Sequence, residues 1–169
     1  MKLHIGGLQA KEGWKILNIM NEEAVDFIGD ISDLSQFSEN SIETIYASHV
    51  FEHLSHKKID GTLDGIYRVL KPGGVFQISV PDMDRLFSLY LNPTTTKQMR
   101  FFLMCVIFGG QNDPFDFHYF GWSEDTLSDA FLRHQFRDVK RVDNFGLFND
   151  TSSMLIGELP ISLNMIATK

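Results

Sequence analysis

The sequence contains a single cysteine, Cys105, among its 169 residues. One cysteine cannot form an internal disulfide, and its free thiol fits a reducing compartment. The longest apolar run, at residues 101–108, is far shorter than the roughly 20 residues that a membrane span needs. The opening MKLHIGG lacks the apolar core of a signal peptide. We therefore predict a cytoplasmic protein that does not enter a membrane.

Clusters of basic residues are also scarce. The formal net charge is −7, and the densest basic stretch is RDVKRV at residues 137–142. Proteins that bind nucleic acid normally carry a basic stripe, so DNA and RNA are not expected partners. The hydrophobic fraction of 43% and the charged fraction of 22% are ordinary for a globular protein, and the length fits one domain. A small molecule is the expected substrate.

Short apolar segments separated by turn residues dominate the first half of the chain. They predict strands at residues 2–6, 14–19, 24–29 and 42–48. Apolar residues then recur at helical spacing over residues 57–70, and KPGG ends this helix because proline cannot continue it. A β-branched strand follows at residues 75–81. Strand, helix and strand in this order indicate a parallel sheet with a right-handed crossover.

The second half predicts helices first and then strands. Two helices are expected at about 83–91 and 95–108, followed by the aromatic-rich loop GGQNDPFDFHYFGW. Ser123 is typical of the residue that caps a helix, and strands are expected at residues 137–145 and 160–168. The helix at 95–108 is apolar on nearly all faces. It is therefore predicted to be buried, either beneath the loop or in a homodimer contact.

The stretch ASHVFEHL contains the pattern His49-x-x-Glu52-His53, which is the inverted zinc-protease motif. Such a protease needs both histidines on one helix and a third protein ligand. Here the motif starts directly after an apolar strand, so the two imidazoles are expected to point in different directions. His118 and Glu158 could supply a third ligand, but neither has a diagnostic spacing. We expect no metal here and keep a zinc hydrolase as an alternative.

The stretches HIGG, GDISDLSQFSENSIETIYASHVFEHL and RVLKPGGVFQISVPD resemble the class I S-adenosylmethionine-dependent methyltransferases. The whole chain is similar to a compact bacterial, methyltransferase type 11-like subgroup that begins directly at the first strand. The resemblance implies a Rossmann-like, doubly wound α/β fold with seven strands in the order 3-2-1-4-5-7-6, the last antiparallel. LQAKEG is too short for the usual first crossover helix, so that helix should be reduced or absent. One domain, 1–169, would carry an inserted helical and loop lid at about 82–122.

The resemblance also implies roles for residues that follow the first four strands. Gly6 and Gly7 would lie against the methionine part of S-adenosylmethionine, and Asp30 would accept a hydrogen bond from the adenine amino group. The predicted cofactor-binding residues are Gly6, Gly7, Asn18, Asp30, Ile31, Ser48 and His49. Asn18 stands where the family usually has an acidic residue that holds the ribose hydroxyls. An amide lacks the charge that strengthens such bonds, which predicts weaker cofactor binding.

These features predict a methyltransferase that acts on a small-molecule or sugar-like acceptor. Transfer to oxygen or nitrogen can require a base, and histidine has a suitable ordinary pKa. His49 and His118 are therefore the candidate catalytic residues. The reduced glycine turn and Asn18 leave a second interpretation open, that of a homologue that binds the cofactor without catalysis.

Overall fold

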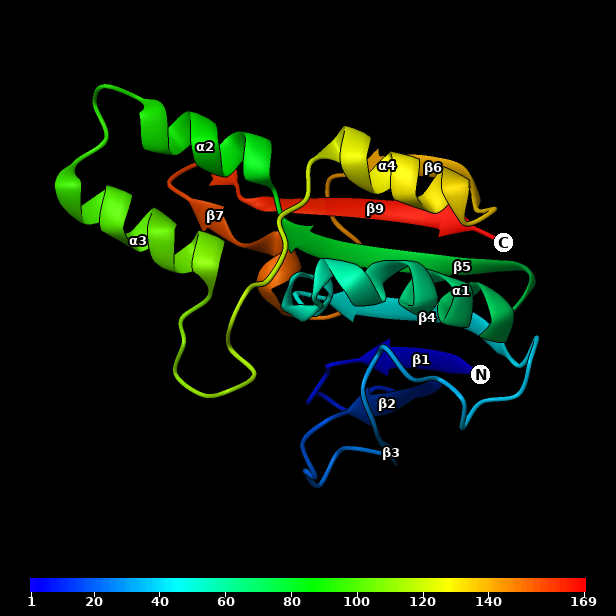
Figure 1. The fold of residues 1–169 in the computed structure, drawn as a ribbon. Helices are drawn as coiled ribbons and strands as arrows, with labels where there is room; N and C mark the ends of the chain where they lie inside the picture. Colours follow the sequence, from blue (N-terminus) through cyan, green and yellow to red (C-terminus); the bar gives the residue numbers. More distant parts are fainter.

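The computed structural model describes residues 1–169 and contains one seven-stranded sheet with four α-helices (Figure 1). The strands of the sheet are β1 (Lys2–Ile5), β2 (Trp14–Asn18), β3 (Phe27–Ile28), β4 (Ile42–Ser48), β5 (Leu70–Pro81), β6 (Arg137–Val142) and β9 (Ser162–Thr168). The helices are α1 (Ile59–Val69), α2 (Met83–Leu91), α3 (Lys97–Phe108) and α4 (Glu124–Arg133). A hairpin of β7 (Leu155–Ile156) and β8 (Leu159–Pro160) and the 3-10 turns η1 (Phe51–His53), η2 (His56–Lys58) and η3 (Thr151–Ser153) complete the structure.

The strand order is β3-β2-β1-β4-β5-β9-β6. Because β9 is the seventh strand of this sheet in sequence, the predicted order 3-2-1-4-5-7-6 is confirmed. Neighbours from β3 to β5 pair in parallel, whereas β9 pairs antiparallel with both β5 and β6. The expected loss of the first crossover helix is also confirmed. The connections from β2 to β3 and from β3 to β4 lack helices as well, in agreement with the turn residues that separate the predicted strands.

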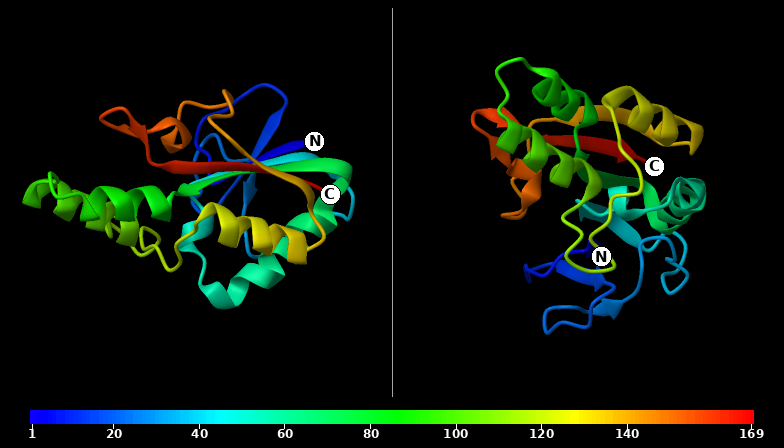
Figure 2. Two further views of the ribbon diagram at one scale, coloured as in Figure 1. Left: turned by 90° about the horizontal axis from the view of Figure 1, so that it is seen from above. Right: turned by 60° about the vertical axis from the view of Figure 1, so that its left-hand side comes forward.

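Helices α1 and α4 pack on one face of the sheet, which the left view of Figure 2 shows nearly edge-on. The apolar stripe of α1 is buried at Ile59, Leu63 and Ile66, as its 3.6-residue spacing predicts. Phe131 of α4 meets Phe76 of β5 edge to face, with ring centroids 5.8 Å apart and planes at 86°. Such a pair contributes about 1 kcal/mol beyond its buried area. This layer forms the main core.

The opposite face of the sheet is covered by the segment between β6 and β9, as Figure 2 shows. Here the inward residues are His4 and Tyr46, both buried. Phe148 of the covering segment lies over them, with its ring 4.0 Å from His4 and 5.3 Å from Tyr46. The Tyr46 hydroxyl donates to the Asp150 carboxylate at 2.8 Å. On this face the sheet is thus covered by aromatic and polar contacts with the segment between β6 and β9, in the place where crossover helices would otherwise pack.

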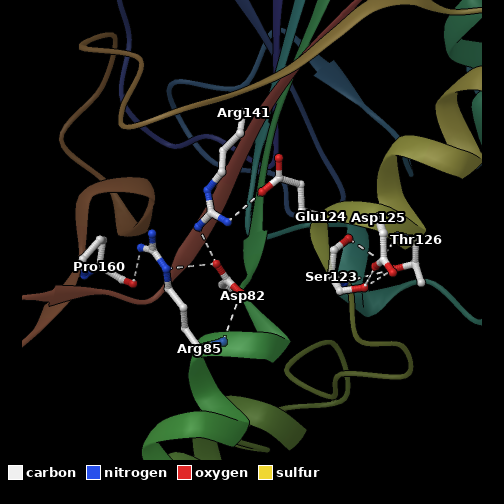
Figure 3. Close-up of polar contacts among 8 residues, drawn as sticks. All are labelled: Asp82, Arg85, Ser123, Glu124, Asp125, Thr126, Arg141 and Pro160. Carbon is white, nitrogen blue, oxygen red and sulfur yellow. Dashed lines mark hydrogen bonds and ion pairs between the residues drawn. The ribbon is translucent and has the colours of Figure 1, made fainter.

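Helices α2 and α3 form an arm that projects past the carboxyl ends of β4 and β5 (Figure 1). Asp82, at the junction of β5 and α2, is 1% exposed and accepts the backbone N–H of Arg85, which caps the helix. Figure 3 shows the Asp82 carboxylate between two guanidinium groups, those of Arg85 and Arg141. Arg85 also donates to the carbonyl of Pro160, and Arg141 to Glu124. This network ties the arm to β6, α4 and the β7–β8 hairpin.

Helix α3 was predicted to be buried, but within the chain most of it is not. Only Leu103 and Ile107 are buried, whereas Phe101 is 73% exposed. The reason is that α3 packs against α2 on one side and meets no layer on the other (Figure 1). A homodimer contact over this face therefore stays a prediction. No helix in the structure combines the length and apolar character needed to cross a membrane.

Candidate functional site

A cavity of about 280 Å³ lies where β1, β2, β3 and β4 reach their carboxyl ends. In open α/β sheets this edge is where ligands bind. Five of the residues predicted to bind the cofactor line it, namely Gly6, Asn18, Asp30, Ile31 and His49. Pro114, Phe115 and Tyr119, from the loop after α3, line it from another side. The structure thus brings part of the predicted lid to the predicted cofactor residues.

The turn after β1 depends on a glycine at position 6. Gly6 has φ +78°, a conformation that side chains disfavour, and a Cβ there would lie 2.4 Å from Cγ2 of Val50. Its N–H donates to the carbonyl of Leu17 at 2.8 Å, which ties the end of β1 to β2. Both Gly6 and Val50 line the cavity, so this part of its wall consists of backbone and one apolar side chain.

Asn18 uses its amide to shape the cavity edge. Its Nδ2 donates to the carbonyl of Gly7 at 3.1 Å, and its Oδ1 accepts from the N–H of Met20 at 2.9 Å. One N–H and one lone pair of the amide remain. An aspartate could not make the first of these bonds, because an ionised carboxylate has no donor. An amide rather than a carboxylate is therefore needed at position 18 to hold the turn after β1. The sequence alone, which showed only that the usual acidic residue is replaced, did not indicate this role.

Gly7, Ser48 and His118 were also predicted site residues, and none of them lines the cavity. A Cβ on Gly7 would lie 2.3 Å from Nδ1 of His4, so this glycine makes room for the His4 ring. Ser48 alternates with Ala47 along β4 and shares the face of Tyr46. The His118 ring lies behind His53, with ring centroids 4.8 Å apart.

His49 directly follows β4 and has φ +52°, an uncommon conformation for a histidine that is often found at functional sites. Its Nε2 is 2.9 Å from Oγ of Ser162, which donates its own proton to the carbonyl of Thr151. Nε2 must therefore be the donor. Nδ1 lies 3.0 Å from Oε1 of Glu52. Both ring nitrogens are thus directed at protein groups, Nε2 at Ser162 and Nδ1 at the buried Glu52 carboxylate, and neither is left free to face an acceptor molecule in the cavity.

The chain is similar to known methyltransferases in sequence and in fold. Residues 11–78 match the family model described as "Methyltransferase domain", and this stretch contains Asn18, Asp30 and His49. No curated protein sequence matches the chain. A SAM-dependent methyltransferase from Archaeoglobus fulgidus superposes with a TM-score of 0.59 at 19% identity, covering 99% of this chain and 85% of the other.

Two further solved structures share the fold. A SAM-dependent methyltransferase from Thermotoga maritima has a TM-score of 0.59 at 15% identity, over 99% of this chain and 81% of the other. The 1,6-didemethyltoxoflavin-N1-methyltransferase of Burkholderia thailandensis, solved with S-adenosylhomocysteine, has a TM-score of 0.58 at 16% identity, over 99% and 70%. The resemblance to the class I methyltransferases is confirmed. At these identities the solved structures establish the methyltransferase fold.

Beside the cavity of this methyltransferase fold lies a buried carboxylate that sequence reasoning considered only within the zinc motif. Glu52 is fully buried, and its backbone carbonyl accepts the N–H groups of Tyr119 and Phe120. Burial raises the pKa of its carboxyl group, but the nearby His49, His53 and His118 together lower it below the ordinary value. The Glu52 side chain is therefore a buried anion, and its backbone carbonyl holds the loop after α3 near the strand ends.

His118 lies on the other side of this carboxylate. Its Nε2 is 3.9 Å from Oε1 of Glu52, and its ring is mostly buried. Burial lowers the pKa of His118, and the charge of Glu52 opposes this effect without overcoming it. The neutral imidazole is thus the favoured form of His118. The contact between His118 and Glu52 was missed because no local sequence pattern specified that the aromatic loop folds back onto η1.

Proposed function

We propose that the protein is an S-adenosylmethionine-dependent methyltransferase that acts on a small-molecule acceptor. The observation that carries this proposal is the cavity at the strand ends, which gathers Gly6, Asn18, Asp30, Ile31 and His49. Their donors, acceptors and apolar surfaces fit a nucleoside with an amino-acid arm. The match of residues 11–78 to a methyltransferase domain and the bound S-adenosylhomocysteine in the Burkholderia protein support the same ligand.

The lining residues suit separate parts of such a cofactor. Asp30 is exposed at the end of β3, and its Oδ1 already accepts the N–H of Ser32 at 2.7 Å. Its second carboxylate oxygen is an acceptor for an adenine amino group, with Ile31 beside the ring. Asn18 has one N–H and one lone pair left for the ribose. Gly6 is exposed and has no side chain of its own, so its backbone is accessible to the amino-acid arm.

Bound S-adenosylmethionine would supply an electrophilic methyl group on its sulfonium. The task of the chain is then to position the acceptor, because orientation provides much of the acceleration of such a substitution. Phe115 and Tyr119 border the cavity and would exclude water from it. Of the two histidines predicted as bases, only His49 lines the cavity. The hydrogen bond of Nε2 to Ser162 and the contact of Nδ1 with Glu52 favour an orienting role.

Binding of S-adenosylhomocysteine tests the proposal directly. We expect calorimetry to show one site per chain and a rise in the melting temperature, since the ligand binds only the folded state. Gly6→Ala should weaken binding because its Cβ would meet Val50, and Asp30→Ala should weaken it without a change in the backbone. The matched control is Gly61→Ala in α1, where an added Cβ meets nothing within 4 Å. No shift at millimolar ligand would refute the proposal.

A second experiment separates an enzyme from a protein that only binds the cofactor. A set of small hydroxylated and amine-containing metabolites, including sugars, is incubated with protein and S-adenosylmethionine, and S-adenosylhomocysteine release is measured. We expect release with at least one acceptor and little in its absence. Tight binding with no release for any acceptor would instead favour the non-catalytic interpretation.

A further inference from the structure

Three side chains that could hold a metal ion meet between η1 and the loop after α3. The ligand atoms of Glu52, His53 and His118 all lie within 4.8 Å of one another. Two of these residues come from the H-x-x-E-H motif, but the third is His118 rather than His49. The sequence reasoning expected His49 and His53 to point apart, and His49 indeed faces Ser162 and Glu52. The folded loop supplies the imidazole that the motif alone lacks.

The carboxylate of Glu52 is unusual because it is buried without a hydrogen bond. The residue is 0% exposed, and neither Oε1 nor Oε2 has a hydrogen-bond partner. The 3.0 Å contact with Nδ1 of His49 is close enough for an ion pair but lies off hydrogen-bond geometry. A buried carboxylate normally requires full pairing or a metal ion. At least one oxygen of Glu52 is therefore available to a cation.

The two imidazoles are oriented as metal ligands are. Nδ1 of His53 donates to the carbonyl of Phe117 at 3.0 Å, which leaves Nε2 with its lone pair. Metal-bound histidines commonly donate their other nitrogen to a carbonyl or carboxylate in this way. His118 presents Nε2 to Glu52, and its Nδ1 is buried without a partner. Its neutral form has the lone pair that a metal requires.

We propose that Glu52, His53 and His118 form a binding site for a divalent transition-metal ion of the Zn²⁺ class. Two imidazole nitrogens with one carboxylate favour such ions, whereas Mg²⁺ and Ca²⁺ prefer oxygen ligands alone. Three protein ligands leave at least one coordination position open, as in catalytic zinc sites. The ligand atoms need to approach by about 1 Å or more, since zinc–nitrogen bonds are roughly 2 Å long.

The position of the site suggests its use, and this step rests on the proposed function. His53 also lines the cavity, so the open coordination position is adjacent to the space around the cofactor residues. A metal ion there would bind an oxygen or nitrogen of the acceptor and orient it. The acceptor class would then be molecules with a hydroxyl, phenol, carboxylate or amine that can ligate a metal.

The test of the site uses Zn²⁺ alone, without cofactor or acceptor, so its failure is independent of the proposed function. We expect chelator-treated protein to bind one Zn²⁺ per chain by calorimetry and Mg²⁺ far more weakly. His118→Ala and Glu52→Gln should each lower Zn²⁺ affinity by about 100-fold or more, exceeding the roughly 10- to 100-fold typical of groups that only orient a ligand. Thermal melting checks that both variants fold.

Two control variants exclude other sites. His134 contacts Asp60 and Asp64 on the surface at 3.1 and 2.8 Å, and His134→Ala should leave Zn²⁺ binding unchanged. His49→Asn, which tolerates the positive φ, should also retain binding. Loss of Zn²⁺ binding in His134→Ala would overturn the proposal. So would loss of binding in His49→Asn while His118→Ala still binds, and so would the absence of Zn²⁺ binding by the unmodified protein. If the variants unfold, anomalous diffraction from Zn²⁺-soaked crystals decides, with a peak expected among the three side chains and a peak elsewhere contradicting it.

Discussion

At the scale of single residues, Asn18 illustrates a side chain whose role depends on its backbone partners. The resemblance places it where an acidic residue usually contacts the ribose, so sequence reasoning predicts weaker cofactor binding and a gain on mutation to aspartate. In the structure the amide bridges the carbonyl of Gly7 and the N–H of Met20. The turn after β1 therefore requires a donor at position 18, and aspartate has none.

Asn18→Asp is accordingly expected to destabilise the fold. The change removes the Nδ2 donor and places a buried carboxylate beside the Gly7 carbonyl, a loss of about 1–3 kcal/mol in the free energy of unfolding. Urea denaturation followed by circular dichroism measures it. Asn21→Asp, at an exposed position three residues past the end of β2, is the matched control and should have little effect. An Asn18→Asp protein as stable as its parent would show that the Gly7 bond contributes little.

Single residues also show where prediction from sequence reached its limit. Gly6, Asp30 and His49 line one cavity because each closely follows a strand, and parallel strands end at one edge; their contact with a cofactor stays a prediction. Gly7 was assigned to the cofactor by the same rule, but its missing side chain accommodates His4 on the opposite face. The identity of a glycine does not tell which neighbour needs the space.

At the scale of elements, the local patterns were reliable and the long-range contacts were not. The helix expected at 83–91 is α2 (Met83–Leu91), and the strand expected at 42–48 is β4, because apolar spacing and caps act within a few residues. The β7–β8 hairpin was missed since its strands have two residues each. The return of the loop after α3 onto Glu52 depends on contacts between distant segments, and no periodicity encodes them.

The α2–α3 arm provides an element-scale prediction, because its attachment depends on Asp82. Asp82→Asn keeps the helix cap but removes the charge between Arg85 and Arg141 (Figure 3). We expect a loss of about 2 kcal/mol, below the value for a fully buried pair because both arginines reach solvent. Asp84→Asn, exposed in the same helix, is the control. Limited proteolysis should cleave the arm faster in Asp82→Asn only, and equal cleavage rates would contradict this role.

At the scale of the whole molecule, the two faces of the sheet differ in how they are stabilised. One face packs apolar side chains against α1 and α4, whereas the other buries polar rings beneath the segment between β6 and β9. Apolar packing is insensitive to pH, but a buried titratable ring is not. The polar face should therefore make the stability of the entire fold depend on pH through His4.

Burial lowers the pKa of His4 from 6.5 to about 4, although the Asp150 carboxylate opposes this shift. As the pH falls below 6.5, the unfolded chain takes up a proton that the folded chain refuses, so the free energy of unfolding decreases. The decrease continues until the pH passes about 4, where the folded chain also binds the proton. The contribution that is lost across this window is about 3 kcal/mol, at 1.36 kcal/mol per unit of pKa.

His4→Phe keeps an aromatic ring against Phe148 and cannot bind a proton, so it isolates this effect from other titrating groups. We expect its free energy of unfolding to fall less than that of the parent protein between pH 7.5 and pH 4.5, by about 2 kcal/mol. Urea midpoints at a series of pH values measure the difference. His56→Ala, which removes an exposed histidine, should leave the pH dependence of the parent unchanged. Parallel curves for the parent protein and His4→Phe would mean that the His4 ring is protonated in the fold, and that the covering segment stabilises its charge through Asp150.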